Sequence, residues 1–192
     1  MIKDYSRQLK ALQQLYDDLR FDMRKRWKRD LPFEELLFDR WERARSLKFG
    51  KQSSIYHNSY VYGDVEVGEK TWIGPFTLLD GTGGLIIGDN CSISAGVQIY
   101  THDTVKWAVS GGKMKYEYAP VEIGDNCFIG PQSVIAKGCR IGRHAVIGAG
   151  SFVNDDVPPF TIAAGTPCRP IGRVKLDARG NVTFIYAKRG KR

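Results

Sequence analysis

Aliphatic residues recur every six positions through the central part of the chain. The period is unbroken from residue 55 to 79, resumes after a two-residue slip at 81–84, and returns at residue 123 after a longer interruption. A helix would repeat near 3.6 residues and a half-buried strand near 2, and neither produces this pattern. The pattern predicts a coil of short strands joined by tight turns, with inward positions at Ile55, Val61, Val67, Ile73, Leu79, Ile87, Ile93, Ile99, Ile123, Ile129, Ile135, Ile141, Ile147 and Val153.

A second set of positions supports this register. A small or β-branched residue stands two positions before most of the aliphatic ones, and glycine directly follows many of them. Glycine relieves the steric strain where a turn needs unusual backbone angles, and stacked coils would bury a continuous column of Ile and Val. The small positions are Val65, Thr71, Thr77, Cys91, Val97, Cys127, Ser133, Cys139, Ala145 and Ser151.

The cysteines fit the same repeat. Cys91, Cys127 and Cys139 occupy small inward positions, and Cys168 follows the repeats. Their spacing matches no zinc template, so we expect four packing residues with free thiols and no disulfide.

Stretches such as IGDNCSI, IGDNCFIGPQSVI and IGRHAVIGAGSFV resemble the hexapeptide-repeat family. The resemblance covers about residues 55–172 and implies a mainly β fold, a left-handed parallel β-helix with three hexapeptides in each triangular coil. The left-handed sense comes from the resemblance alone, because parallel crossovers are otherwise overwhelmingly right-handed. We expect three parts: an N-terminal helical segment (1–50), the β-helix (51–172), and a C-terminal hairpin with a basic tail (173–192).

The two flanks carry different patterns. Apolar residues spaced alternately by four and three positions predict an amphipathic helix within residues 1–30, and a second helix is expected from Phe33 to about Ser46, with Pro32 near its start. This segment either covers the end of the β-helix or binds a partner, or it packs against its own or a sister subunit. Beyond the repeats, residues 174–176 and 182–186 flank a Gly-containing turn and predict a hairpin.

Composition narrows the class of protein. The chain is 42% hydrophobic and 26% charged, which is typical of a globular protein. No apolar run is long enough to span a bilayer and no secretory signal is visible, so we expect no transmembrane segment and a cytoplasmic location. The net charge is +8, of which +6 lies in residues 173–192. Such a tail either attracts an anionic ligand or is merely solvated, and no nucleic-acid partner is expected.

The long interruption between Ile99 and Ile123 carries the candidate chemistry. It predicts a projecting loop (103–119), and His102 lies where the regular coil gives way to it. A histidine with Asp103 as its neighbour is suited to general-base work, because the pKa of imidazole is close to working pH. His57 and His144, by contrast, are expected to be surface residues.

From Ile87 to Arg173 the chain resembles the galactoside, maltose and serine acetyltransferase group. VPPFTIAAGTPCRPIG is similar to the closing segment of that group, and His102 matches its catalytic base. The resemblance implies a homotrimer that binds acetyl-CoA in the groove between neighbouring subunits, with no metal required. By position it implies a CoA site lined by Phe128, Gly130, Ala149, Asn154, Asp155 and Arg169, with Arg173 or Lys175 as a further basic contact.

We expect transfer of an acetyl group to a hydroxyl of a sugar or polysaccharide-type acceptor. Trp107 and Tyr118 could cover the face of a sugar ring, and Asp80 and Asp103 are expected on the acceptor side. One alternative is an N-acetyltransferase of an amino sugar or nucleotide-linked amino sugar, in which one of these carboxylates would hold the amine. A metal enzyme similar to the γ-class carbonic anhydrases would need three converging histidines. A non-catalytic scaffold or binding protein is the remaining alternative.

Overall fold

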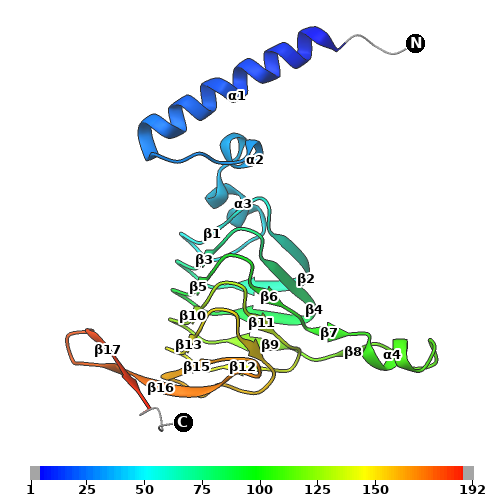
Figure 1. Ribbon diagram of the computed structural model, residues 1–192, viewed down its shortest axis with the longest axis vertical. Coiled ribbons are helices and arrows are strands. Elements are labelled where there is room, and N and C mark those ends of the chain that lie inside the picture. The colour runs from blue at the N-terminus through cyan, green and yellow to red at the C-terminus, as the bar shows by residue number, and fades with distance from the viewer. Residues whose placement is uncertain (1–4, 188–192) are drawn as a thin grey trace.

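The computed structural model describes residues 5–187 and has a tapered solenoid as its body (Figure 1). Short parallel strands stack in rows along its length. One row runs through strands 18 residues apart wherever the coil is regular. Its members are β1 (Ser54–Ile55), β3 (Trp72–Ile73), β5 (Ser92–Ile93), β10 (Phe128–Ile129), β13 (Val146–Ile147) and β15 (Thr161–Ala164).

Two further rows complete the triangular coil. The long strands β2 (Tyr60–Val67) and β4 (Leu78–Ile87) bend through a corner and belong to both rows. Their first halves stack with β6 (Gln98–Ile99), β11 (Val134–Ile135) and β14 (Phe152–Val153). Their second halves stack with β9 (Val121–Ile123) and β12 (Arg140–Ile141). The parallel β-helix expected from the repeat is confirmed.

The inward column is the core of the molecule. Of the aliphatic positions expected to point inward, all but Val61 are buried, and Val61 packs against the buried cluster. Burial of one such side chain contributes roughly 1.5–3 kcal/mol. The small positions are also buried, apart from Val65, which is partly buried against the same cluster. They include Cys91, Cys127 and Cys139, and all four cysteines are free thiols.

The two-residue slip at 81–84 has a structural cause. Here β4 passes through a corner at which neighbouring coils approach closely. A Cβ on Gly81 would lie 2.2 Å from the carbonyl oxygen of Asp64, and one on Gly83 would lie 2.4 Å from that of Thr101. Only glycine fits these contacts, and the contact of Gly83 brings this part of β4 against Thr101, at the start of the long loop.

The helical segment covers the first coil. Helix α1 (Ser6–Trp27) projects away from the solenoid, and α2 (Phe33–Leu37) and α3 (Arg40–Ser46) connect it to β1 (Figure 1). The prediction of one helix from Phe33 to Ser46 is wrong. Phe38 is extended, and the carboxylate of Asp39 accepts hydrogen bonds from the backbone N–H groups of Trp41 and Glu42, which starts a new helix.

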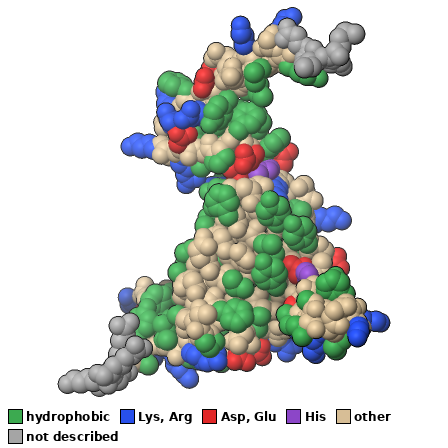
Figure 2. All heavy atoms as spheres, turned by 45° about the vertical axis from the view of Figure 1, so that its right-hand side comes forward, with side chains coloured by type: hydrophobic (Ala, Val, Ile, Leu, Met, Phe, Trp, Pro, Cys, Tyr) green, Lys and Arg blue, Asp and Glu red, His purple; other side chains and the backbone are tan. Residues whose placement is uncertain are grey.

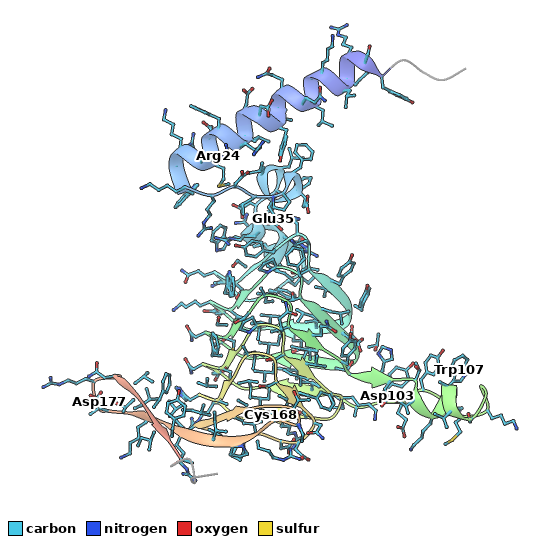
Figure 3. All side chains as sticks on the ribbon, in the orientation of Figure 1. Arg24, Glu35, Asp103, Trp107, Cys168 and Asp177 are labelled. Atoms are coloured by element: carbon cyan, nitrogen blue, oxygen red, sulfur yellow. The ribbon has the colours of Figure 1, made fainter. Side chains whose placement is uncertain are left out.

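Side chains of α2 and α3 fix this cover to the solenoid. The carboxylate of Glu35 accepts a hydrogen bond from the backbone N–H of His57, at 2.5 Å, and lies between α1 and the first coil (Figure 3). The guanidinium of Arg43 donates to the carbonyl oxygens of Tyr56 and Ser59. The apolar stripe of α1 does not reach the solenoid, since no residue of this helix is buried.

The C-terminal hairpin predicted from the sequence is confirmed. Strand β16 (Arg169–Leu176) pairs antiparallel with β15 and then with β17 (Val182–Tyr186), and Asp177 lies in the turn (Figure 3). The basic residues 188–192 lie outside the described residues. Within the part of the chain that is described, no helix is long and apolar enough to cross a membrane.

Candidate active site

The loop leaves the solenoid directly after β6. Its stem is a short antiparallel pair, β7 (His102–Asp103) with β8 (Glu117–Tyr118), and its outer part carries helix α4 (Val105–Val109). The whole loop projects to one side of the body, close to its wider end (Figure 1). His102 is therefore the first residue of the stem, as the sequence predicts.

His102 pairs with a buried carboxylate from the preceding coil. Its Nδ1 lies 2.6 Å from Oδ2 of Asp80, and the hydroxyl of Thr82 lies 3.0 Å from the same nitrogen. The side chain of His102 is 33% exposed, whereas that of Asp80 is 2% exposed. One end of the imidazole ring is thus held inside the protein.

Asp80 is ionised in this environment. Burial alone would raise the pKa of its carboxyl group, but several hydrogen bonds outweigh this effect and lower the pKa to about 2. The donors are the hydroxyl and backbone N–H of Thr82, the backbone N–H of Thr101, and His102. Because the carboxylate is ionised, it accepts from Nδ1–H of His102, and in the neutral ring this tautomer places the lone pair on Nε2.

The structure corrects two expectations about the acidic residues. Asp103, the chain neighbour of His102, is not its partner, because successive side chains of a strand point to opposite sides. The carboxylate of Asp103 instead lies 3.0 Å from the ammonium group of Lys137. Asp80 was expected on the acceptor side, but it is buried and both its oxygens accept hydrogen bonds from the protein.

A signal for Asp80 was present in the repeat. Leu79 and Ile99 are stacked inward residues of neighbouring coils, so the chain after Leu79 must lie beside the chain after Ile99. If the two-residue slip at 81–84 is assigned to the corner of the coil after Asp80, the repeat places Asp80 beside the residues that follow Ile99, including His102.

Aromatic side chains of the loop lie next to His102. The ring of Tyr118 stacks on the imidazole with centroids 5.8 Å apart, and Trp107 packs edge-on against Tyr116. Apolar side chains gather on part of the surface of the projecting loop (Figure 2). A hollow of about 580 Å³ lies in the outer part of the loop, lined by Trp107, Gly112, Lys113, Met114, Lys115, Tyr116 and Tyr118. The two aromatic residues predicted to contact the acceptor, Trp107 and Tyr118, both line it.

The residues predicted to contact CoA are divided between two edges of the solenoid. Asn154 and Asp155 follow β14, at the same edge as His102, and Asp155 lies 3.5 Å from the guanidinium of Arg169. Ala149 follows β13 at the next edge. The structure does not bring these two groups together within one chain.

The remaining predicted CoA contacts differ in accessibility. Phe128 and Lys175 are exposed on β10 and β16. Gly130 is buried, and a Cβ there would lie 2.5 Å from the backbone nitrogen of Ala149. The close stacking of coils therefore accounts for this glycine.

The other histidines lie elsewhere. His57 packs against Phe38 at the first coil, and His144 stacks on Phe160 with centroids 4.7 Å apart. The metal-enzyme alternative requires three histidines that converge on one ion, and His57 and His144 are not placed beside His102. Across residues 5–187, no group of three His, Cys, Asp or Glu side chains is placed to hold a metal ion.

Comparison with known families agrees with this architecture. The family described as bacterial transferase hexapeptide (six repeats) matches residues 120–155, and the hexapeptide repeat of succinyl-transferase matches residues 80–101. In these two segments the chain carries the repeats of the hexapeptide-repeat transferases. Asp80 is the first residue of the matched segment 80–101, and most of the predicted CoA contacts lie in the segment 120–155.

Individual members of this family are similar over most of the solenoid. Galactoside O-acetyltransferase of Escherichia coli (strain K12) is 32% identical over 128 residues, which cover 56% of this chain and 63% of the relative. This chain spans 45–63% of the length of the first curated relatives it matches.

Solved structures of the family extend the likeness to the flanks. A galactoside acetyltransferase in complex with coenzyme A is 25% identical with a TM-score of 0.62, covering 89% of this chain and 84% of that one. A hexapeptide-repeat acetyltransferase of Vibrio cholerae O1 biovar eltor, complexed with acetyl coenzyme A, is 26% identical with a TM-score of 0.57, covering 91% and 93%. An N-acyltransferase from Bacillus cereus, at 22% identity and a TM-score of 0.60, covering 71% and 89%, shares the fold.

Proposed function

We propose that this chain is an acetyl-CoA-dependent O-acetyltransferase in which His102 is the general base. The observation that carries the proposal is the 2.6 Å contact between Nδ1 of His102 and the buried carboxylate of Asp80. It leaves Nε2 as the proton acceptor at the half-open base of a loop lined with aromatic residues. Relatives named as acetyltransferases, and one solved with acetyl coenzyme A, support the donor.

The reaction needs one base and no covalent enzyme intermediate. Nε2 of His102 removes the proton from an acceptor hydroxyl while its oxygen attacks the thioester carbonyl carbon. The C–O bond forms, the C–S bond breaks, and the imidazolium returns the proton to the departing thiolate. Thiolate is an easy leaving group, because the pKa of a free thiol is about 8.5. Backbone N–H groups aimed at the oxyanion would contribute roughly 3–4 kcal/mol.

Asp80 supports this step without touching substrate. Its ionised carboxylate fixes the ring orientation and the tautomer of His102, and it stabilises the imidazolium that forms during transfer. A scaffold protein has no need of a buried carboxylate with this set of donors. The arrangement therefore favours an enzyme over the non-catalytic alternative.

We propose that CoA lies between two subunits of a homotrimer. In one chain, Asn154 and Asp155 share the edge of His102, whereas Phe128 and Ala149 lie towards the next edge. Side-by-side packing of solenoids would bring one edge of a subunit against the other edge of its neighbour. Arg169 and Lys175, both exposed, would then supply positive charge for the phosphate groups of CoA.

A hydroxyl acceptor is favoured over an amine. An amine is mostly protonated at neutral pH, so an N-acetyltransferase would need a free carboxylate close to the base. Both predicted candidates are occupied: Asp80 is buried, and Asp103 is paired with Lys137. Glu117 is paired as well, with Lys106 at 2.5 Å. The hollow of the loop, which shares Tyr118 with the surroundings of His102, instead offers aromatic faces suited to a sugar ring.

Product chemistry tests the proposal. Purified protein is incubated with acetyl-CoA and a panel of galactosides, amino sugars and oligosaccharides, and free thiol release is measured, with His102→Ala as the control. We expect release that depends on the acceptor and on His102, and a product whose acetyl group mild alkali removes. An alkali-stable product would establish the N-acetyl alternative, and no release with any acceptor, together with no binding of CoA, would refute the enzyme.

A further inference from the structure

Four charged side chains meet at the base of the loop. The ammonium group of Lys137 lies 3.0 Å from Oδ2 of Asp103 and 3.5 Å from Oε2 of Glu117. Lys106, on α4, lies 2.5 Å from Oε1 of the same glutamate. Figure 3 shows Asp103 at this base, between the solenoid and Trp107 of the outer loop. The cluster thus joins the body of the solenoid to both strands of the loop stem.

The stem needs a cation at this place. Asp103 and Glu117 are direct cross-strand partners in the β7–β8 pair. Two like charges opposite each other destabilise such a pair. Lys137 offsets the repulsion from outside the loop, because it follows β11 on the next coil of the solenoid. It therefore closes the stem and attaches it to the body in one contact.

The same pair of strands carries the reactive histidine. His102 is paired with Tyr118 in the ladder, one step along from Asp103 and Glu117. The backbone angle of the stem thus sets where the ring of Tyr118 stacks over His102. Movement of the stem by about 1 Å would misplace both, and misplacement of this size costs up to about 10²-fold in rate.

We propose that Lys137 is a positioning residue that clamps the loop stem to the solenoid and thereby holds His102 and Tyr118 ready for the acceptor. Its effect on kinetics rests on the proposed acetyltransferase activity, whereas its effect on the loop does not. Each partner favours the charged state of the other: the contact with Asp103 raises the pKa of Lys137, and that with Lys137 lowers the pKa of Asp103. The clamp is consequently charged across the neutral pH range.

The experiment compares Lys137→Met, which keeps the length of the side chain and removes its charge, with Lys137→Arg, which keeps the charge. Lys51→Met is the matched control, because Lys51 is an exposed lysine of the solenoid away from the loop and has no ion pair among the described residues. Hydrogen exchange of amides 102–118 and the rate of trypsin cleavage within the loop are measured on each folded protein. Steady-state kinetics with acetyl-CoA and an active acceptor follow.

We expect Lys137→Met to speed exchange and cleavage by about tenfold or more, since an opened stem exchanges locally without global unfolding. The KM for the acceptor should rise by about tenfold, with the KM for acetyl-CoA unchanged. Lys137→Arg should restore both, and Lys51→Met should change neither. The Tm should stay within a few degrees of the parent, because the cluster lies outside the inward column.

Two outcomes would overturn the clamp. One is unchanged exchange and cleavage in Lys137→Met; the other is equal loosening in the Lys51→Met control. If Lys137→Met does not fold, Glu117→Gln weakens the clamp from the loop side and is judged by the same measurements. The exchange result stands even if no acceptor is ever acetylated, so failure of the clamp and failure of the proposed activity are distinguishable.

Discussion

Replacing Asp80 by Asn tests the pairing on which the proposed mechanism depends. The carboxylate accepts from five donor groups, which belong to Thr82, Thr101 and His102. An amide of the same shape has one oxygen and an NH₂ group, so at least one buried donor would face another donor. Whichever way the amide turns, the charge that holds the proton on Nδ1 of His102 is lost.

The magnitude follows from the environment of the carboxyl group. Its pKa is lowered from the ordinary 3.8 to about 2, a difference that corresponds to roughly 2–3 kcal/mol of folding stability. Because the pKa is lower in the folded protein, this stabilisation is complete above about pH 4 and is lost as the pH falls towards 2. Catalysis should suffer more: loss of the orienting carboxylate is expected to lower kcat by about 10²–10⁴-fold.

Asp64→Asn is the matched control, because Asp64 precedes Asp80 by one coil at the same edge and is exposed. Unfolding free energy is measured by denaturant titration from pH 2.5 to 7, and turnover by thiol release. The deficit of Asp80→Asn relative to the parent should shrink below pH 4, whereas Asp64→Asn should match the parent throughout. A stable Asp80→Asn protein with parental turnover would show that the carboxylate neither holds His102 nor supports its role.

Three further outcomes are expected. His102→Ala should lower turnover by at least about 10²-fold with assembly unchanged; parental turnover in the purified variant would remove His102 from the mechanism. Ile141→Asp should prevent folding, because Ile141 is 2% exposed in the inward column and an unpaired charge there is costly. Ile86→Asp, at an outward position that is 48% exposed, should fold. Equal solubility and Tm in the two variants would contradict the inward register. Light scattering should give the mass of a trimer, and a stable, active monomer would refute the shared CoA site.

The solenoid was predictable because its rule is local. Every coil repeats the same inward and outward positions, so Ile129 and Ile141 could be assigned to the core without any knowledge of long-range contacts. The C-terminal hairpin was predictable for the same reason, since a Gly-containing turn brings two adjacent segments together. The break between α2 and α3 was missed, because the capping carboxylate of Asp39 outweighed a continuous helical pattern.

The sequence by itself also determined that His102 opens the interruption of the repeat, since that position is a property of spacing. Only the tertiary structure decided which side chains surround it. Asp80 and Lys137 reach the loop stem from the preceding and the following coil, 22 and 35 positions away. Neighbours in the chain are a poor guide here, because adjacent side chains of a strand diverge while residues one coil apart stack at hydrogen-bonding distance. Asp103, the residue next to His102, therefore pairs with Lys137, and the partner of His102 is Asp80.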